Sequence, residues 1–160
     1  MSAAEVHLTL NHLPVLLSTV GAGLLGAGLY LRSSDLKNAG FFFMILGGLV
    51  AIPVYLSGQP AEVLLKNYPG VSRAAIHEHE NAAWYSFIAL EISAAGALVA
   101  FILLFRKKAV SKLVCVVLLL LVAVACGALV RTAHLGGLIR HEEIQTPAES
   151  ERFDAGSSTR

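Results

Sequence analysis

Four long apolar runs limit what this chain can fold into. Each is long enough to cross the hydrocarbon core of a bilayer as a helix, which takes about 20 residues. The runs extend over Leu13–Leu31, Ala39–Ser57, Ala82–Phe105 and Val110–Ile139. They are continuous and do not alternate with polar residues, so strands of a membrane barrel are disfavoured, whereas a helix pairs its backbone groups within its own segment. We therefore expect four transmembrane helices.

Composition and connection lengths extend this prediction to an all-α bundle. Hydrophobic residues make up 56% of the chain, charged residues only 14%, and the mean hydropathy is +0.68, far more apolar than a soluble domain of this size requires. The links are short, so neighbouring helices are expected to be antiparallel. The sequence predicts one integral membrane four-helix up-and-down domain over residues 1–144, with helices at about 13–31, 39–57, 77–105 and 110–141, and a polar flexible tail over 145–160.

The basic residues predict the orientation of this bundle. Two of the three connections are basic, and they contain Arg32, Lys37, Arg106, Lys107 and Lys108 against a single acid, Asp35. The positive-inside rule places these connections in the cytoplasm. Both termini and the middle connection are then periplasmic, as in a multi-pass protein of the bacterial inner membrane. No basic segment or Ala-x-Ala site marks the first helix as a signal peptide.

All six histidines fall on the predicted outer side. They are His7 and His12 near the first helix, His77 and His79 at the start of the third, and His134 and His141 at the end of the fourth. An amphipathic ring at a membrane interface explains some of them. His134, however, lies about 9 Å inside the helix, at a depth where an ionisable residue is a candidate for a functional site.

Small residues lie beside these histidines and leave room for a flat ligand. Gly136 and Gly137 follow His134, and a stripe of alanine, serine and glycine continues at helical spacing below His79. A comparable stripe in the first helix contains Gly21, Ala22, Gly26 and Ala27. Tight helix packing alone would explain either stripe. Two stripes beneath outer histidines favour haem b, whose iron takes axial imidazoles from facing helices.

The predicted ligands of this haem iron are His12, His79 and His134. His141 lies about 10.5 Å from His134 along the same helix face, too far to bind the same iron from that side. A second haem therefore stays open, with His141 and either His77 or His7 as its ligands.

Charged residues inside the apolar runs allow two interpretations. A buried pair between Glu91 and Arg131 would avoid two unpaired charges in lipid. Alternatively, one of them contacts a haem propionate or a quinone, or relays a proton. Arg140 and Arg73, nearer the outer surface, are more natural propionate partners.

Other chemistries find little support in the sequence. The chain has no HExxH, GxSxG, Walker or GxGxxG motif, and no nucleic-acid partner is expected. The cysteines Cys115 and Cys126 form no CxxC pattern and are interpreted as packing residues. His12 and the HEHE segment, His77–Glu80, leave open a zinc or copper site, although acids at a helix start also complement the helix dipole.

Two motifs resemble a bacterial domain-of-unknown-function family of predicted four-helix membrane proteins. HLTLNHLPVLL (His7–Leu17) is similar to the start of helix 1 in that family, and HLGGLIRHEEI (His134–Ile144) to its Gly-Gly followed by Arg-His. A histidine at the start of helix 3, here His77 or His79, completes the match. The resemblance implies a relationship to small b-type cytochrome membrane subunits and supports His7, His12 and His141 as part of the set. His134 and the doubled histidine of HEHE depart from the family pattern.

Together these features predict a haem-binding electron-transfer relay subunit, and not an enzyme by itself, near the periplasmic face of a larger redox complex. Its partners would be the lipid bilayer and other membrane or periplasmic redox proteins. Two alternatives stay open: a structural or assembly subunit without haem, and an outer-face zinc- or copper-binding protein.

Overall fold

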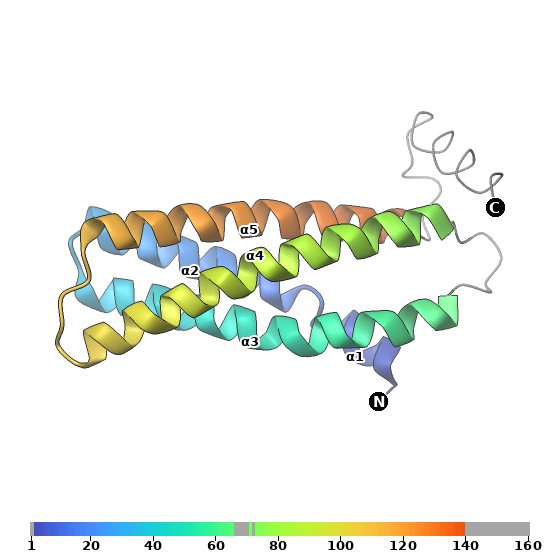
Figure 1. Ribbon diagram of the computed structural model, residues 1–160, viewed down its shortest axis with the longest axis horizontal. Helices are drawn as coiled ribbons and strands as arrows, with labels where there is room; N and C mark the ends of the chain where they lie inside the picture. The colour runs from blue at the N-terminus through green and yellow to red at the C-terminus, as the bar shows by residue number, and fades with distance from the viewer. Residues whose placement is uncertain (1, 66–70, 72, 140–160) are drawn as a thin grey trace.

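Five helices make up the part of the chain that the structure describes. The structure is a computed structural model, and it describes residues 2–65, 71 and 73–139. The helices are α1 (Ala3–Leu10), α2 (Leu13–Tyr30), α3 (Ser34–Leu65), α4 (Arg73–Phe105) and α5 (Lys112–Leu138), and no strand occurs in these residues. Figure 1 shows the four long helices side by side, each antiparallel to the one before it. The predicted all-α class is confirmed, and four spans are long and apolar enough to cross a membrane.

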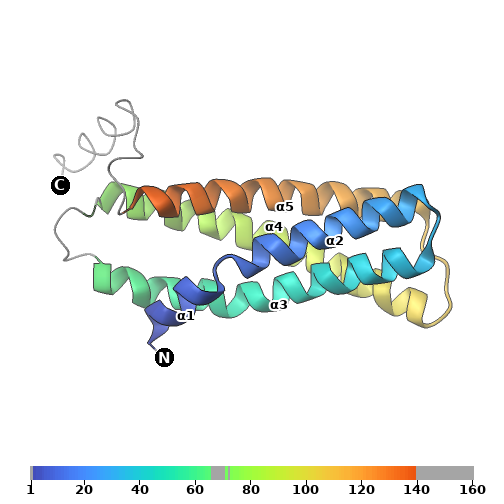
Figure 2. The same cartoon turned by 180° about the vertical axis from the view of Figure 1, so that it is seen from behind.

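The first predicted helix is preceded by a short helix that the sequence analysis did not anticipate. α1 ends at Leu10, and α2 begins at Leu13 with Pro14 in its first turn. A proline ring clashes with the carbonyl group four residues earlier, which here belongs to Leu10, so one continuous helix is disfavoured. Figure 2 shows α1 turned away from α2 and lying beside α3.

Two predicted boundaries were wrong at the end of the bundle that carries α1. α3 continues past Ser57 to Leu65, through both Pro53 and Pro60, where the sequence analysis predicted a connection. α4 begins at Arg73, four residues before the predicted start. Proline inside a membrane helix is tolerated where neighbouring groups satisfy the freed backbone, and α1 packs against this part of α3. The predicted tail, and the end of the fourth helix at 140–141, lie outside the described residues.

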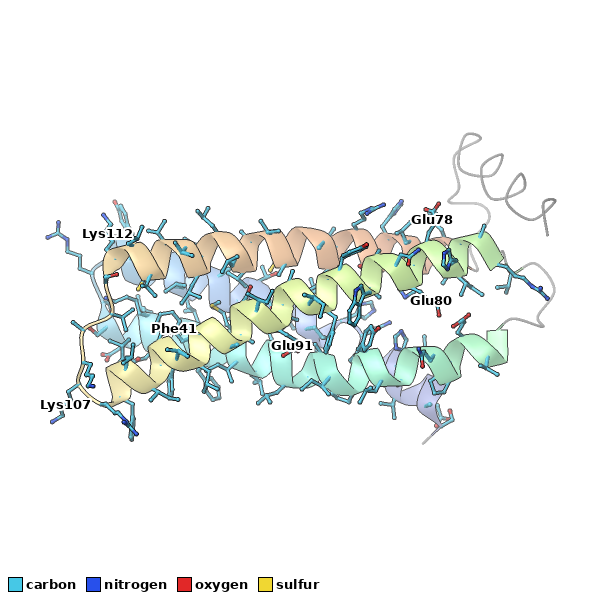
Figure 3. All side chains as sticks on the ribbon, viewed as in Figure 1. Phe41, Glu78, Glu80, Glu91, Lys107 and Lys112 are labelled. Atoms are coloured by element: carbon cyan, nitrogen blue, oxygen red, sulfur yellow. The ribbon has the colours of Figure 1, made fainter. Side chains whose placement is uncertain are left out.

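The two ends of the bundle differ in charge. Figure 3 labels Lys107 and Lys112 at the end formed by the α2–α3 and α4–α5 connections, and Glu78 and Glu80 toward the other. Arg32 and Lys107 are in the left-handed backbone conformation, with φ of 54° and 56°, at the C-terminal ends of α2 and α4. The histidine-bearing segments of α1, α4 and α5 lie at the acidic end (Figure 1).

A close backbone contact in the basic half joins α2 and α3 through glycine. A Cβ atom placed on Gly40 would lie 2.7 Å from the backbone nitrogen of Leu25, and one placed on Gly21 would lie 2.9 Å from the backbone nitrogen of Met44. Leu25 and Met44 are fully buried in the main core cluster with Phe41. Small residues therefore bring the two backbones together, as is typical of membrane helix contacts.

We expect Gly40→Ala to lower the free energy of unfolding by about 1–3 kcal/mol, because the added methyl group meets backbone that cannot rotate away. The matched control is Gly127→Ala on α5, where a Cβ atom meets nothing within 4 Å. This control should raise stability by about 0.5–1 kcal/mol, the usual gain from replacing glycine within a helix. Thermal unfolding in mild detergent measures both. Equal effects of the two variants would contradict the proposed α2–α3 contact.

Candidate functional site

His7 on α1 is hydrogen-bonded to the backbone of α3. Its Nδ1 lies 2.9 Å from the carbonyl oxygen of Val54, and the hydroxyl of Ser57 lies 3.4 Å from the same nitrogen. A carbonyl oxygen only accepts hydrogen bonds, so Nδ1 carries a proton and donates it to this bond. In a neutral ring the lone pair is then on Nε2.

The position of His7 depends on how α1 is held. Ser2 and Glu5 form a capping box: the Ser2 hydroxyl accepts from the Glu5 N–H at 3.2 Å, and the Glu5 carboxylate accepts from the Ser2 N–H at 2.7 Å. A helix of eight residues is marginal by itself, so the cap and the packing on α3 are both needed. The His7 bond to Val54 is part of that packing.

His79 on α4 makes the corresponding bond to α5. Its Nδ1 lies 2.9 Å from the carbonyl oxygen of Thr132, so this ring too donates from Nδ1. A Cβ atom placed on Gly136 would lie 3.0 Å from Cε1 and 3.2 Å from Nδ1 of His79. The flat group that Gly136 admits in this structure is therefore the imidazole of His79.

Hydroxyl groups also contact each other between α4 and α5, two turns further along α4 from His79. The Oγ of Ser86 lies 2.8 Å from Oγ1 of Thr132, and each hydroxyl also contacts the carbonyl four residues before it on its own helix. Ser86 is buried, as are Ala82, Ser93 and Ala97 on the same stripe of α4. The small-residue stripe of the sequence analysis is thus the inner face of α4.

His7 and His79 are held in the same way at the acidic end. Each donates from Nδ1 to the main chain of a neighbouring helix, His7 to α3 and His79 to α5. Among the described residues, no hydrogen-bond partner contacts Nε2 of either ring. Histidines that bind metals commonly have this arrangement, in which a carbonyl orients Nδ1 and leaves Nε2 to the metal.

The other predicted histidine ligands in the described residues are exposed. His12 is the N-cap residue of α2, and its side chain makes no capping hydrogen bond. Nε2 of His77 lies 3.2 Å from the side-chain nitrogen of Asn81. His134 is on an exposed position of α5. Of the three ligands predicted for one iron, only His79 is half-buried. His7, which was predicted as a possible ligand of the second haem, is also half-buried.

The remaining predicted site residues lie in the last two turns of α5 or beyond its end. Arg131 is exposed, and a Cβ atom on Gly137 would meet nothing within 4 Å, in contrast to Gly136. Arg140 and His141 lie outside the described residues. The predictions that Arg140 contacts a propionate and that His141 binds a second haem stay predictions.

Glu91 does not pair with Arg131 in the described structure. Its Oε1 is buried and has no hydrogen-bond partner among these residues, while Arg131 is on the exposed face of α5. Figure 3 shows Glu91 between α4 and α3, near the middle of the bundle. Its Oε2 would lie 3.4 Å from a Cβ atom placed on Gly48 of α3. The carboxyl group therefore turns toward α3, away from the predicted partner.

A cluster of aromatic rings joins α3 and α4. The rings of Tyr55 and Phe87 are stacked with their centroids 4.5 Å apart, and Trp84 lies 5.9 Å from Tyr55. Tyr55 directly follows Val54, the acceptor for His7. The sequence analysis missed this cluster, although aromatic residues near a membrane surface are a recognisable signal.

Comparison with protein-family models, curated proteins and solved structures finds no match to this chain. The resemblance to a domain-of-unknown-function family therefore stays a hypothesis based on the two terminal motifs.

We expect Gly136→Ala to shift the His79 ring by a few tenths of an ångström and to lower the free energy of unfolding by about 1 kcal/mol, because its methyl group would lie 3.0 Å from Cε1 and the 2.9 Å bond from Nδ1 to the Thr132 carbonyl resists the shift. Gly137→Ala is the matched control and should raise stability by up to about 1 kcal/mol, because open space surrounds that position. Thermal unfolding compares the two. Indistinguishable midpoints would show that His79 does not lie against Gly136.

We expect Glu91→Leu to raise the free energy of unfolding by about 1–3 kcal/mol, because it removes a polar group whose buried oxygen lacks a partner. Glu91→Gln keeps polar atoms at the same place and should change stability much less. The measurement is again thermal unfolding in detergent. A lower midpoint for Glu91→Leu would instead mean that the carboxyl group makes a stabilising interaction.

Proposed function

We propose that this chain binds haem b through His7 and His79 and acts as an electron-transfer subunit of a membrane redox complex. The observation that carries the proposal is that both rings are held by the same kind of hydrogen bond. Each is fixed by an Nδ1 hydrogen bond to a main-chain carbonyl at 2.9 Å, and each keeps Nε2 for a further partner. Two imidazoles would suffice as the protein ligands of a b-type haem, to which His7 and His79 would each contribute one.

The number of histidines favours haem over a bare metal ion. A structural zinc site is almost always bound by four protein ligands, and catalytic zinc by three with water. Within residues 2–65, 71 and 73–139, no group of three or more His, Cys, Asp or Glu residues could hold a metal ion. Two imidazoles suffice for haem, because the porphyrin supplies the other four nitrogens. The zinc or copper alternative is therefore the weaker proposal.

The residues around the pair suit a fixed redox group. A bound haem supplies one-electron chemistry, with a potential set by its axial ligands and by nearby hydrogen bonds. The carbonyls of Val54 and Thr132 would strengthen the two imidazoles as ligands by accepting their Nδ1 protons. Tyr55, Phe87 and Trp84 would cover the α3–α4 side.

The proposal includes an orientation in the membrane. With the basic connections in the cytoplasm, the histidine pair lies near the periplasmic face of a bacterial inner membrane. Electrons would pass between this haem and a periplasmic or membrane-bound redox partner. The connections within the described chain are short, so a partner protein would supply any substrate site.

A structural role is the second candidate, and one observation favours it. Each histidine already joins two helices, His7 binding α1 to α3 and His79 binding α4 to α5. These bonds would stabilise the bundle without a cofactor, by about 1 kcal/mol each. The structural and haem proposals differ in the absorption spectrum that they predict for the purified protein.

We expect the full chain, purified in mild detergent after haem-replete expression, to show a b-type reduced-minus-oxidised spectrum. His7→Ala and His79→Ala should each remove or strongly shift this spectrum, because each takes away one axial ligand. His12→Ala and His77→Ala are matched controls, since both are exposed histidines at the same end, and they should keep the wild-type spectrum.

The outcomes separate the two candidates. A colourless wild-type protein, with thermal unfolding midpoints lowered in His7→Ala and His79→Ala but not in the controls, would establish the structural role. Loss of the spectrum in His12→Ala with His7→Ala unaffected would instead assign the ligands as the sequence analysis predicted.

A further inference from the structure

A pocket opens at the basic end of the bundle, away from the histidine pair. It has a volume of about 260 Å³ and is formed between α2, α3 and the start of α5. Its lining includes three cationic side chains, from Arg32, Lys37 and Lys112, with Gly28 and Cys115 beside them and no carboxylate. Three positive charges around one small space favour an anionic occupant.

Arg32 has a left-handed backbone conformation at the end of α2, as Lys107 has at the end of α4. Its φ of 54° is in the left-handed region, and the Ser33 N–H donates to the Gly28 carbonyl at 3.0 Å in the hydrogen-bond pattern of a helix C-terminus. Glycine is the usual residue at such a position, because a side chain there costs about 1–2 kcal/mol. The chain has an arginine at the rim of the pocket instead.

Lys37 is fixed from the other side by the backbone of α2. A Cβ atom on Gly28 would lie 2.8 Å from both Cγ and the backbone nitrogen of Lys37, so the aliphatic part of the lysine packs directly on the glycine. This contact directs a half-buried lysine along the pocket wall. Glycine at position 28 is required for that close approach.

Lys112 adds charge where the helix itself is already positive. It is the first residue of α5, and the first turn of that helix contains no acid to complement the dipole. A cation at a helix N-terminus is unfavourable by itself and becomes favourable when an anion binds there. The pocket thus lies beside the N-terminal end of α5, where the Ser111 hydroxyl already accepts from the Val114 N–H, and three cationic residues line it.

We propose that this pocket binds the phosphate group of an anionic phospholipid such as phosphatidylglycerol. It lies where α2 and α5 reach the end of their apolar spans, at the level expected for lipid headgroups. Basic pockets between membrane helices on the cytoplasmic side are suited to such headgroups, and a guanidinium group can hold two phosphate oxygens at once. A soluble phosphate would share this chemistry, so the test separates the two sources.

The experiment is native mass spectrometry of the full chain in detergent, titrated with phosphatidylglycerol and, separately, with zwitterionic phosphatidylcholine. We expect phosphatidylglycerol to bind in preference. Lys37→Gln and Lys112→Gln should each weaken its binding about fivefold, the effect of roughly one lost cation at a membrane surface. Lys108→Gln is the matched control, since it removes the same charge from the same end but does not line the pocket. Circular dichroism checks that each variant is folded.

Three outcomes would overturn the proposal. Equal weakening by all three lysine variants would mean a general attraction to the basic end and no pocket. Equal binding of the two lipids by the wild-type protein would exclude recognition of anionic charge. Displacement of phosphatidylglycerol by millimolar inorganic phosphate, with the same variant profile, would assign the pocket to a soluble phosphate.

Discussion

The close contact between α2 and α3 is the interaction on which the other features depend. In lipid there is no hydrophobic force between apolar helices, so association relies on close packing, and Gly21 and Gly40 allow two backbones to approach almost to contact. The same approach sets Lys37 against Gly28 at the basic end. It also positions the outer part of α3, where the Val54 carbonyl receives His7.

The acidic end is organised by side chains that bind main-chain carbonyls. His7 and His79 each donate to a neighbouring helix, and Ser57 donates to the same carbonyl as His7. Such bonds satisfy polar groups that would otherwise face an apolar surrounding. They also fix the direction of the remaining ring nitrogens. The same contacts therefore support either a redox site or a purely structural role in joining helices. The presence or absence of a bound chromophore distinguishes these two roles.

The two ends use polar residues in different ways. At the acidic end the imidazoles of His7 and His79 are held by backbone carbonyls, whereas at the basic end Arg32, Lys37 and Lys112 line one pocket. Between the two ends, Glu91 is the ionisable residue whose buried oxygen lacks a partner in the described structure. The charge difference fits an orientation with the basic end in the cytoplasm.

The sequence by itself determined the helical class, the four apolar spans and the gathering of histidines at one end, because apolar length and residue spacing are local properties. It did not reveal α1 or the continuation of α3 through Pro53 and Pro60, because proline in a sequence usually marks a helix end and the contact between α1 and α3 is tertiary. Only the tertiary structure decided that His7 and His79 turn inward while His12 and His134 are exposed, and that Glu91 turns away from Arg131. The rotation of each helix about its axis and the carbonyl partners on Val54 and Thr132 set these directions. Every residue has a backbone carbonyl, so the sequence does not show which one a histidine will bind.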